Sequence, residues 1–256
     1  MAHGQNPFKQ LVSIRRDEWP QALSFAVYFF LVISVFWVLK PLKKELLVGF
    51  YQDAPLELFG WGLNGAQAEQ LAKVLNMGVA FVAVIVFSAL SDRLRRERLT
   101  YAWGGFMGAV LVAFSLLVEP PSAATVWGFY LFGDLFNTVM VASFFAFAND
   151  AIRPQSAKRM YGIIGLGGVA GGAFGTTTLR ATLGLVSAGT WMWIAAAAML
   201  AVCAVAYAAG RCFCIEVSSP QGCEEVGELH VGGALASALL VFRSHYLLGL
   251  VALVGI

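Results

Sequence analysis

Charged residues are scarce in this chain, and their scarcity excludes the commonest class of protein. Asp, Glu, Lys and Arg make up 12% of the 256 residues, whereas hydrophobic residues make up 59%. Soluble domains carry about 25% charged residues, and the mean hydropathy of +0.74 is far above what they tolerate. A water-soluble globule is therefore excluded. The formal net charge of +2, with basic residues only in short clusters, also predicts no nucleic-acid partner.

Patterns of catalytic and metal-binding residues are lacking as well. The sequence has no Ser-His-Asp set, no His-Glu-x-x-His motif and no paired carboxylates, and its three histidines lie outside the apolar runs. Cys212, Cys214, Cys223 and His230 are too irregularly spaced for a structural zinc site, which predicts ordinary thiols. We therefore expect neither an enzyme nor a protein that binds a metal or a cofactor.

Long apolar runs are what the sequence has instead. A helix that crosses a hydrocarbon core of ~30 Å needs about 20 apolar residues. Six runs of that kind cover residues 22–39, 74–90, 101–118, 123–148, 161–179 and 190–209. Glycine and proline are frequent and no period-two alternation is present, which favours helices over a membrane β-barrel. The sequence predicts an all-α integral membrane protein with a six-helix transmembrane bundle over residues 22–209.

The segments outside these runs complete the predicted organisation. Residues 1–21 form an N-terminal segment, residues 40–73 a loop of mixed charge, and residues 210–245 a polar linker. A seventh apolar run begins at Tyr246 and stops at Ile256, too soon to cross a bilayer. We expect residues 246–256 to be the truncated start of a seventh span.

Basic residues predict how the bundle is oriented. Twelve of the 17 Lys and Arg residues fall on one side of the predicted topology. These are Lys9, Arg15, Arg16, Arg93, Arg95, Arg96, Arg98, Arg153, Lys158, Arg159, Arg211 and Arg243. Because cytoplasmic loops collect Lys and Arg, we expect both termini to be cytoplasmic in a multi-pass protein of the cell inner membrane.

A glycine-rich stretch over residues 162–175 partly resembles a dinucleotide-binding loop. No strand precedes it, no Gly-Lys-Ser/Thr follows it, and it opens a predicted span. The pairs Gly167/Gly171, Gly168/Gly172 and Gly171/Gly175 have the small-xxx-small spacing that lets helix backbones approach closely in lipid. The stretch therefore predicts helix packing.

Charges at membrane depth are the strongest candidates for function. Asp134 lies in the middle of the fourth run, where a charge costs about 2.5–3.5 kcal/mol, so it should face the bundle interior or an aqueous cavity. The alternative is a structural carboxylate paired with a nearby Lys or Tyr. Lys40, Lys43 and Lys44 would share one helix face and need an anion among them, either Asp134, Glu45 or a substrate phosphate. Otherwise they are snorkelling lysines at a helix end.

Several motifs resemble known transporters. Residues 92–96 (Asp-Arg-Leu-Arg-Arg) resemble a loop of major facilitator transporters, without its glycine. Residues 144–150 (Phe-Phe-Ala-Phe-Ala-Asn-Asp), followed by residues 157–162 (Ala-Lys-Arg-Met-Tyr-Gly), resemble the ATP/ADP translocase family of plastids and intracellular bacteria. Residues 39–43 (Leu-Lys-Pro-Leu-Lys) resemble the end of the first span in that family.

This resemblance implies the N-terminal six-helix half of a major-facilitator-like transporter, which exchanges nucleotides or related phosphorylated anions by alternating access. A Lys and a Glu that are important in the family match Lys43 and Asp134, and we add Lys40 and Asn149 to the expected substrate-binding residues. The implied partners are an anionic small molecule, the lipid bilayer and a missing C-terminal half. Two alternatives remain: a carrier of another solute, proton-coupled through Asp134, and a membrane scaffold or sensor without transport.

Overall fold

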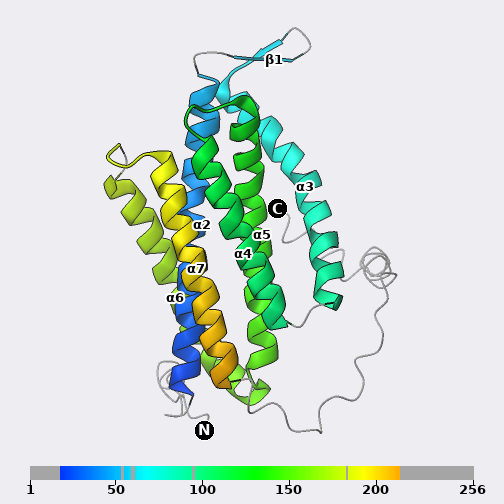
Figure 1. The fold of residues 1–256 in the computed structure, drawn as a ribbon, viewed down its shortest axis with the longest axis vertical. Helices are drawn as coiled ribbons and strands as arrows, with labels where there is room; N and C mark the ends of the chain where they lie inside the picture. Colours follow the sequence, from blue (N-terminus) through cyan, green and yellow to red (C-terminus); the bar gives the residue numbers. More distant parts are fainter. Residues whose placement is uncertain (1–17, 53–54, 59–60, 94–95, 183, 214–256) are drawn as a thin grey trace, which may run out of the picture.

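The computed structural model describes residues 18–52, 55–58, 61–93, 96–182 and 184–213 as a bundle of long helices. Each helix contains a segment long and apolar enough to cross a membrane. The helices run alongside one another (Figure 1) and are α2 (Trp19–Phe50), α3 (Gly65–Arg93), α4 (Arg96–Leu117), α5 (Ala123–Ala151), α6 (Pro154–Thr182) and α7 (Ala188–Phe213). The predicted all-α bundle of six spans is confirmed.

The predicted loop over residues 40–73 is largely wrong. Helix α2 continues to Phe50 with Pro41 inside it, and α3 already begins at Gly65. The residues between them include a small antiparallel hairpin of β1 (Leu56–Leu58) and β2 (Trp61–Leu63), seen at the top of Figure 1. Lys43 and Lys44 in the extension of α2 pair with Asp134 and Glu69, and Lys73 in the extension of α3 pairs with Glu69. These charges are compensated where the helices continue beyond the uncharged runs.

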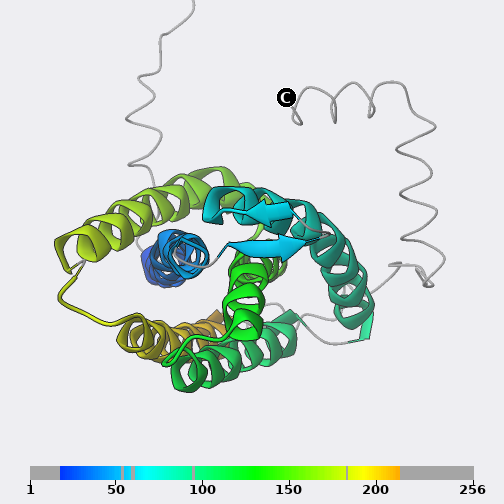
Figure 2. The ribbon, with the colours of Figure 1, turned by 90° about the horizontal axis from the view of Figure 1, so that it is seen from above.

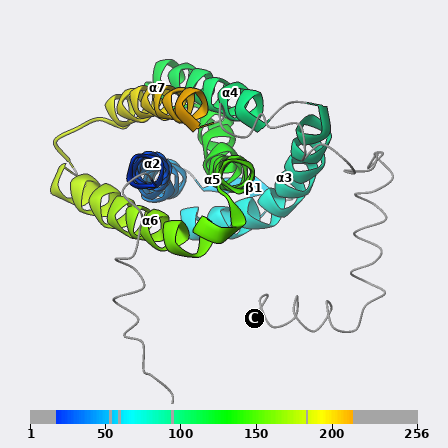
Figure 3. The ribbon, with the colours of Figure 1, turned by 90° about the horizontal axis from the view of Figure 1, so that it is seen from below.

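Helices α2 and α5 occupy the middle of the bundle. Viewed along the helices, α4 and α7 lie on one side of this central pair, while α6 and α3 flank it (Figures 2 and 3). The interface between α2 and α5 is aromatic: Phe25 packs against Phe147 with ring centroids 5.3 Å apart, and Tyr28 meets Phe144 edge-on at 4.9 Å. These buried rings fix the two helices that carry Lys43 and Asp134.

Glycines bring α6 into backbone contact with α2. A Cβ atom added at Gly167 would lie 2.5 Å from the carbonyl oxygen of Ala26, and one at Gly175 would lie 2.6 Å from that of Ser34. Between them, the Ser34 hydroxyl donates a hydrogen bond to the Gly171 carbonyl at 3.1 Å. The glycine stretch is therefore a helix-packing surface within α6, as its spacing predicts.

The two ends of the bundle gather different connections. The start of α2, the turn between α5 and α6 and the end of α7 lie at one end, and the hairpin with the α4–α5 and α6–α7 connections lies at the other (Figure 1). The first end carries Arg153, Lys158 and Arg159. That it faces the cytoplasm stays a prediction. Helix α7 continues to Phe213, so the first residues of the predicted linker over 210–245 are helical. The rest of the linker, with Cys214, Cys223 and His230, and the start of a seventh span at Tyr246 lie outside the described residues.

Candidate functional site

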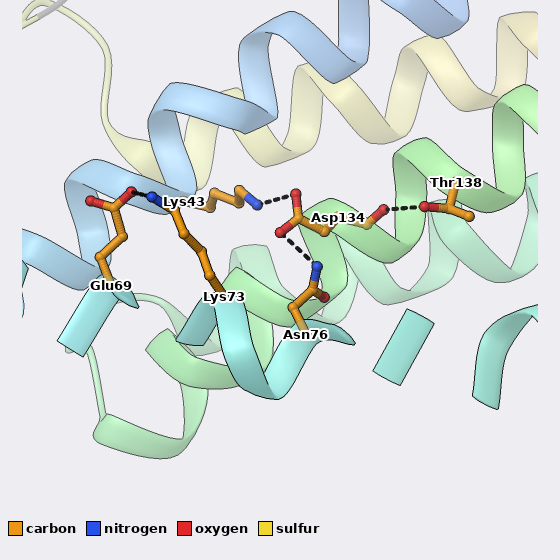
Figure 4. Close-up of polar contacts among 6 residues, drawn as sticks. All are labelled: Lys43, Glu69, Lys73, Asn76, Asp134 and Thr138. Atoms are coloured by element: carbon orange, nitrogen blue, oxygen red, sulfur yellow. Dashed lines mark hydrogen bonds and ion pairs between the residues drawn. The ribbon is translucent and has the colours of Figure 1, made fainter. Parts of the chain in front are cut away.

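An ion pair between α2 and α5 forms the centre of the candidate site. The Lys43 ammonium contacts Oδ1 of Asp134 (Figure 4). Only 6% of the Lys43 side chain is exposed, against 32% of the Asp134 side chain. The two residues that the sequence singles out most strongly are thus brought together. Their charges compensate each other in an apolar bundle, with the carboxylate as the more accessible partner.

A third helix completes the coordination of the carboxylate. The Asn76 side chain, on α3, donates a hydrogen bond from Nδ2 to Oδ2 of Asp134 at 3.0 Å. Each carboxylate oxygen therefore has its own partner. The Asn76 Oδ1 atom is buried and has no hydrogen-bond partner among the described residues, so the site holds an unused acceptor beside the ion pair. On the same helix as Asp134, the Thr138 hydroxyl donates to the Asp134 backbone carbonyl at 3.2 Å.

Neighbouring residues of α5 make room for the Lys43 side chain. A Cβ atom at Gly133 would lie 2.8 Å from Cδ of Lys43, so the lysine stem passes across a position where any larger residue would obstruct it. One turn earlier, the Tyr130 ring centroid lies 4.4 Å from the Lys43 ammonium. The ring face adds a favourable cation–π contact. Asp134 and Tyr130 therefore hold the ammonium from two sides.

A second ionic cluster links α2 to α3 through Lys44, the residue after Lys43. Glu69 is buried, and its carboxylate contacts the Lys44 ammonium at 3.2 Å and the Lys73 ammonium at 3.1 Å. Both lysines are more than half exposed, so their ends stay in a polar environment while Glu69 is held between them. Figure 4 shows Glu69 and Lys73 of this cluster beside the Lys43–Asp134 pair. Together the two clusters tie α3 to the central helices.

Lys40, Lys43 and Lys44 do not share one anionic side chain in the structure, and that a substrate phosphate would gather them stays a prediction. Lys43 pairs with Asp134 and Lys44 with Glu69, while the exposed Lys40 ammonium lies over the Trp37 ring, 5.0 Å from its centroid. Residues three and four apart share a side of the helix, but long flexible side chains follow their own partners.

Asn149 also lies apart from the ion pair, near the other end of α5. Its side-chain oxygen accepts a hydrogen bond from the hydroxyl of Tyr161 on α6. Asn149 follows Asp134 by fifteen residues, which corresponds to about 22 Å along an α-helix. Of the four expected substrate-binding residues, the structure joins Lys43 and Asp134 directly and places Lys40 and Asn149 elsewhere.

Three residues of the site were missed by sequence reasoning. Asn76 carried a signal, because it is a polar residue inside an apolar run, but its orientation toward Asp134 depends on packing. The sequence predicts a loop at Glu69, and a loop residue has no predictable helix partner. Tyr130 looks like any aromatic residue of a membrane helix.

An apolar cluster closes the bundle on the hairpin side of the ion pair. Leu47, Ala68 and Val126 are buried there beside Tyr51, and the Trp127 indole donates a hydrogen bond to the Tyr51 hydroxyl at 2.8 Å. This cluster joins α2, α3 and α5 next to Tyr130.

The arrangement defines a class: a multi-pass helical membrane protein that keeps a buried Lys–Asp pair between its central helices. Residues 2–176 match the Major Facilitator Superfamily, and the chain belongs to that superfamily. It is also 26% identical over 200 residues to ADP,ATP carrier protein 1 of Chlamydia pneumoniae. That alignment covers 64% of this chain and 36% of the carrier, so the chain matches little more than a third of its relative's length. No solved structure matches the chain.

Proposed function

We propose that this chain is part of a transporter that exchanges nucleotides of the ATP/ADP type, or related phosphorylated anions, across a membrane. The observation that carries the proposal is the buried Lys43 ammonium, which is held by a partly exposed carboxylate in the middle of a membrane bundle. Ionisable residues at membrane depth are costly and mark substrate or ion pathways. Membership of the superfamily and the similarity to an ADP,ATP carrier support a transporter of this kind.

The geometry suggests how a phosphate would engage the site. An ammonium has three donors, and the structure engages Lys43 with the carboxylate of Asp134 and the ring of Tyr130. A phosphate that approaches from the exposed side of Asp134 would compete for Lys43, while Asn76 would keep a hydrogen bond to the released carboxylate. Substrate binding would thus exchange one anionic partner of Lys43 for another. Alternating access would then require a second bundle to move against this one.

An uptake assay tests the proposal. Vesicles that contain the complete gene product should accumulate labelled ATP or ADP in exchange for internal nucleotide, and unphosphorylated adenosine should not compete. Lys43→Met should abolish most of this exchange, and Lys43→Arg should retain part of it, because the charge remains on a bulkier, planar group. Lys44→Met is the matched control, since Lys44 lies one residue further on but pairs with Glu69. Exchange at the wild-type rate by Lys43→Met would show that Lys43 does not bind substrate.

A second candidate function is proton-coupled transport of another solute. It is favoured by the 32% exposure of the Asp134 side chain, because protonation of an accessible carboxylate would release Lys43 without any anion. An imposed proton gradient separates the two functions. Proton-coupled uptake should collapse with a protonophore and in Asp134→Asn, whereas nucleotide exchange should continue without a gradient.

A further inference from the structure

One side of α5 carries polar residues at intervals among apolar ones. Asp134, Thr138, Phe145 and Asn149 are separated by four, seven and four residues, so they lie along the same side of the helix. Thr138, Phe145 and Asn149 are exposed. A surface that presents a carboxylate, a hydroxyl and an amide within a membrane span is unsuited to lipid and fits a polar space.

Helix α2 contributes a matching row beside it. Phe29, Phe36 and Lys43 recur every seven residues and share one side of α2. The two rows touch at both ends: Lys43 pairs with Asp134, and the Phe29 ring meets the Phe145 ring edge-on with centroids 5.6 Å apart. The two helices therefore present a common surface, which we call the α2/α5 face. Its ionic and aromatic ends are about 16 Å apart along α5, from eleven residues at 1.5 Å each.

The aromatic end combines flat rings with an amide. The Phe145 side chain is 38% exposed, and its ring stacks on that of Tyr161 with a centroid distance of 6.4 Å and an interplanar angle of 27°. Behind it, Phe29 stacks on Phe144 at 4.5 Å. The Tyr161 hydroxyl donates to the Asn149 side-chain oxygen. Among the described residues the Asn149 amide nitrogen has no hydrogen-bond partner, so it offers a fixed donor beside exposed rings.

We propose that Phe145, Tyr161 and Asn149 form a nucleobase subsite at this end of the α2/α5 face. The base would stack on the Phe145 ring and present an acceptor of its edge to the Asn149 amide, while the phosphates reach Lys43. This inference rests on the proposed nucleotide transport. An extended nucleoside triphosphate is long enough to span the two ends, whereas an inorganic polyphosphate engages only the ionic end. The subsite therefore determines that the substrate is a nucleotide and not simply a phosphate.

Calorimetry with two ligands tests the subsite. ATP and inorganic tripolyphosphate are titrated into the purified complete gene product, which separates base binding from phosphate binding without requiring transport. Stacking of a base on an aromatic side chain is worth about 1–3 kcal/mol, so Phe145→Leu should raise the Kd for ATP about 5- to 150-fold. The Kd for tripolyphosphate should not change. Phe145→Trp, which keeps a stacking surface, should retain most of the affinity for ATP.

Controls distinguish this role from a structural one. Phe81→Leu removes a ring that is 69% exposed on α3 and should leave both affinities unchanged. Asn149→Ala should weaken the binding of ATP but not that of tripolyphosphate. If the thermal unfolding midpoint shows that Phe145→Leu does not fold, Asn149→Ala provides the test instead. Equal weakening of both ligands, or no change in either, would overturn the subsite while leaving nucleotide transport standing. If neither ligand binds the wild-type protein, the proposed function fails together with the subsite.

Discussion

Removing one charge of the Lys43–Asp134 pair should cost more than removing both. The informative variants are Asp134→Asn and Lys43→Met, which keep the approximate shape of each side chain, and the combination of the two. Each single variant leaves an uncompensated charge in the bundle, whereas the double variant leaves none. The free energy of unfolding should therefore show a strong coupling between the two positions.

The exposures of the two side chains set the expected magnitudes. Asp134→Asn strands an ammonium that is only 6% exposed, and breaking a buried pair costs about 3–5 kcal/mol. We expect about 3 kcal/mol, because the Tyr130 ring remains in contact with the ammonium. Lys43→Met strands a carboxylate that is a third exposed and still bonded to Asn76, so solvent should reduce its cost to about 1–2 kcal/mol. The double variant should be more stable than Asp134→Asn alone.

Denaturant titration in detergent micelles, followed by tryptophan fluorescence, measures these differences without any assumption about substrate. All four proteins should share the same slope, so that differences in midpoint reflect differences in stability. The reasoning is refuted if Lys43→Met proves more destabilising than Asp134→Asn. Strict additivity in the double variant would likewise contradict it, because independent sites show no coupling.

Gly171→Ala should lower the free energy of unfolding by about 1–3 kcal/mol, because its methyl group meets a backbone carbonyl of α2. Gly165→Ala places its methyl group in open space and serves as the control. Equal thermal unfolding midpoints of the two variants would contradict the close contact. Glu69→Gln should lower the free energy of unfolding by about 1–2 kcal/mol and speed amide hydrogen exchange in α3, because two ammonium groups lose their common carboxylate. Unchanged exchange would show that the cluster does not hold α3 in place. A cysteine at Ser122 should react with an impermeant maleimide in intact cells and one at Lys158 only after lysis, and the opposite pattern would reverse the predicted orientation.

Hydropathy alone predicts the positions of the spans, because a helix that crosses lipid satisfies its backbone polar groups internally and presents about 20 apolar residues to the hydrocarbon. Hydropathy does not predict where the helices end, because the apolar runs stop at the first charged residue and the helices continue past it. Helix α2 passes Lys40, Pro41 and Lys44 without stopping. A rule that ends a span at the first charge fails when that charge has a partner on a neighbouring helix, as Lys44 has in Glu69.

The candidate site was only half accessible from the sequence. The cost of a charge in the membrane identified Asp134, and the need for a counter-charge suggested Lys43. The role of Asn76 depends on how α3 is rotated and packed against α5, which no local pattern encodes. Lys40 has the spacing of a site residue, yet its ammonium lies over Trp37. Spacing limits which side chains can meet, and the partners available decide which of them do.

The contact between α6 and α2 has a consequence for how sequence variation should be interpreted. Gly167, Gly171 and Gly175 face carbonyl groups of α2, while Gly165 has open space around it. Substitutions should therefore be rejected at these three positions of α6, which are four residues apart, and accepted at Gly165. Among natural variants the three glycines would look as indispensable as Lys43, for a reason unrelated to chemistry. Screening substitutions for protein abundance and for transport side by side would separate the two. Glycine variants should lose transport in proportion to abundance, whereas Lys43→Met should lose far more transport than its loss of abundance explains.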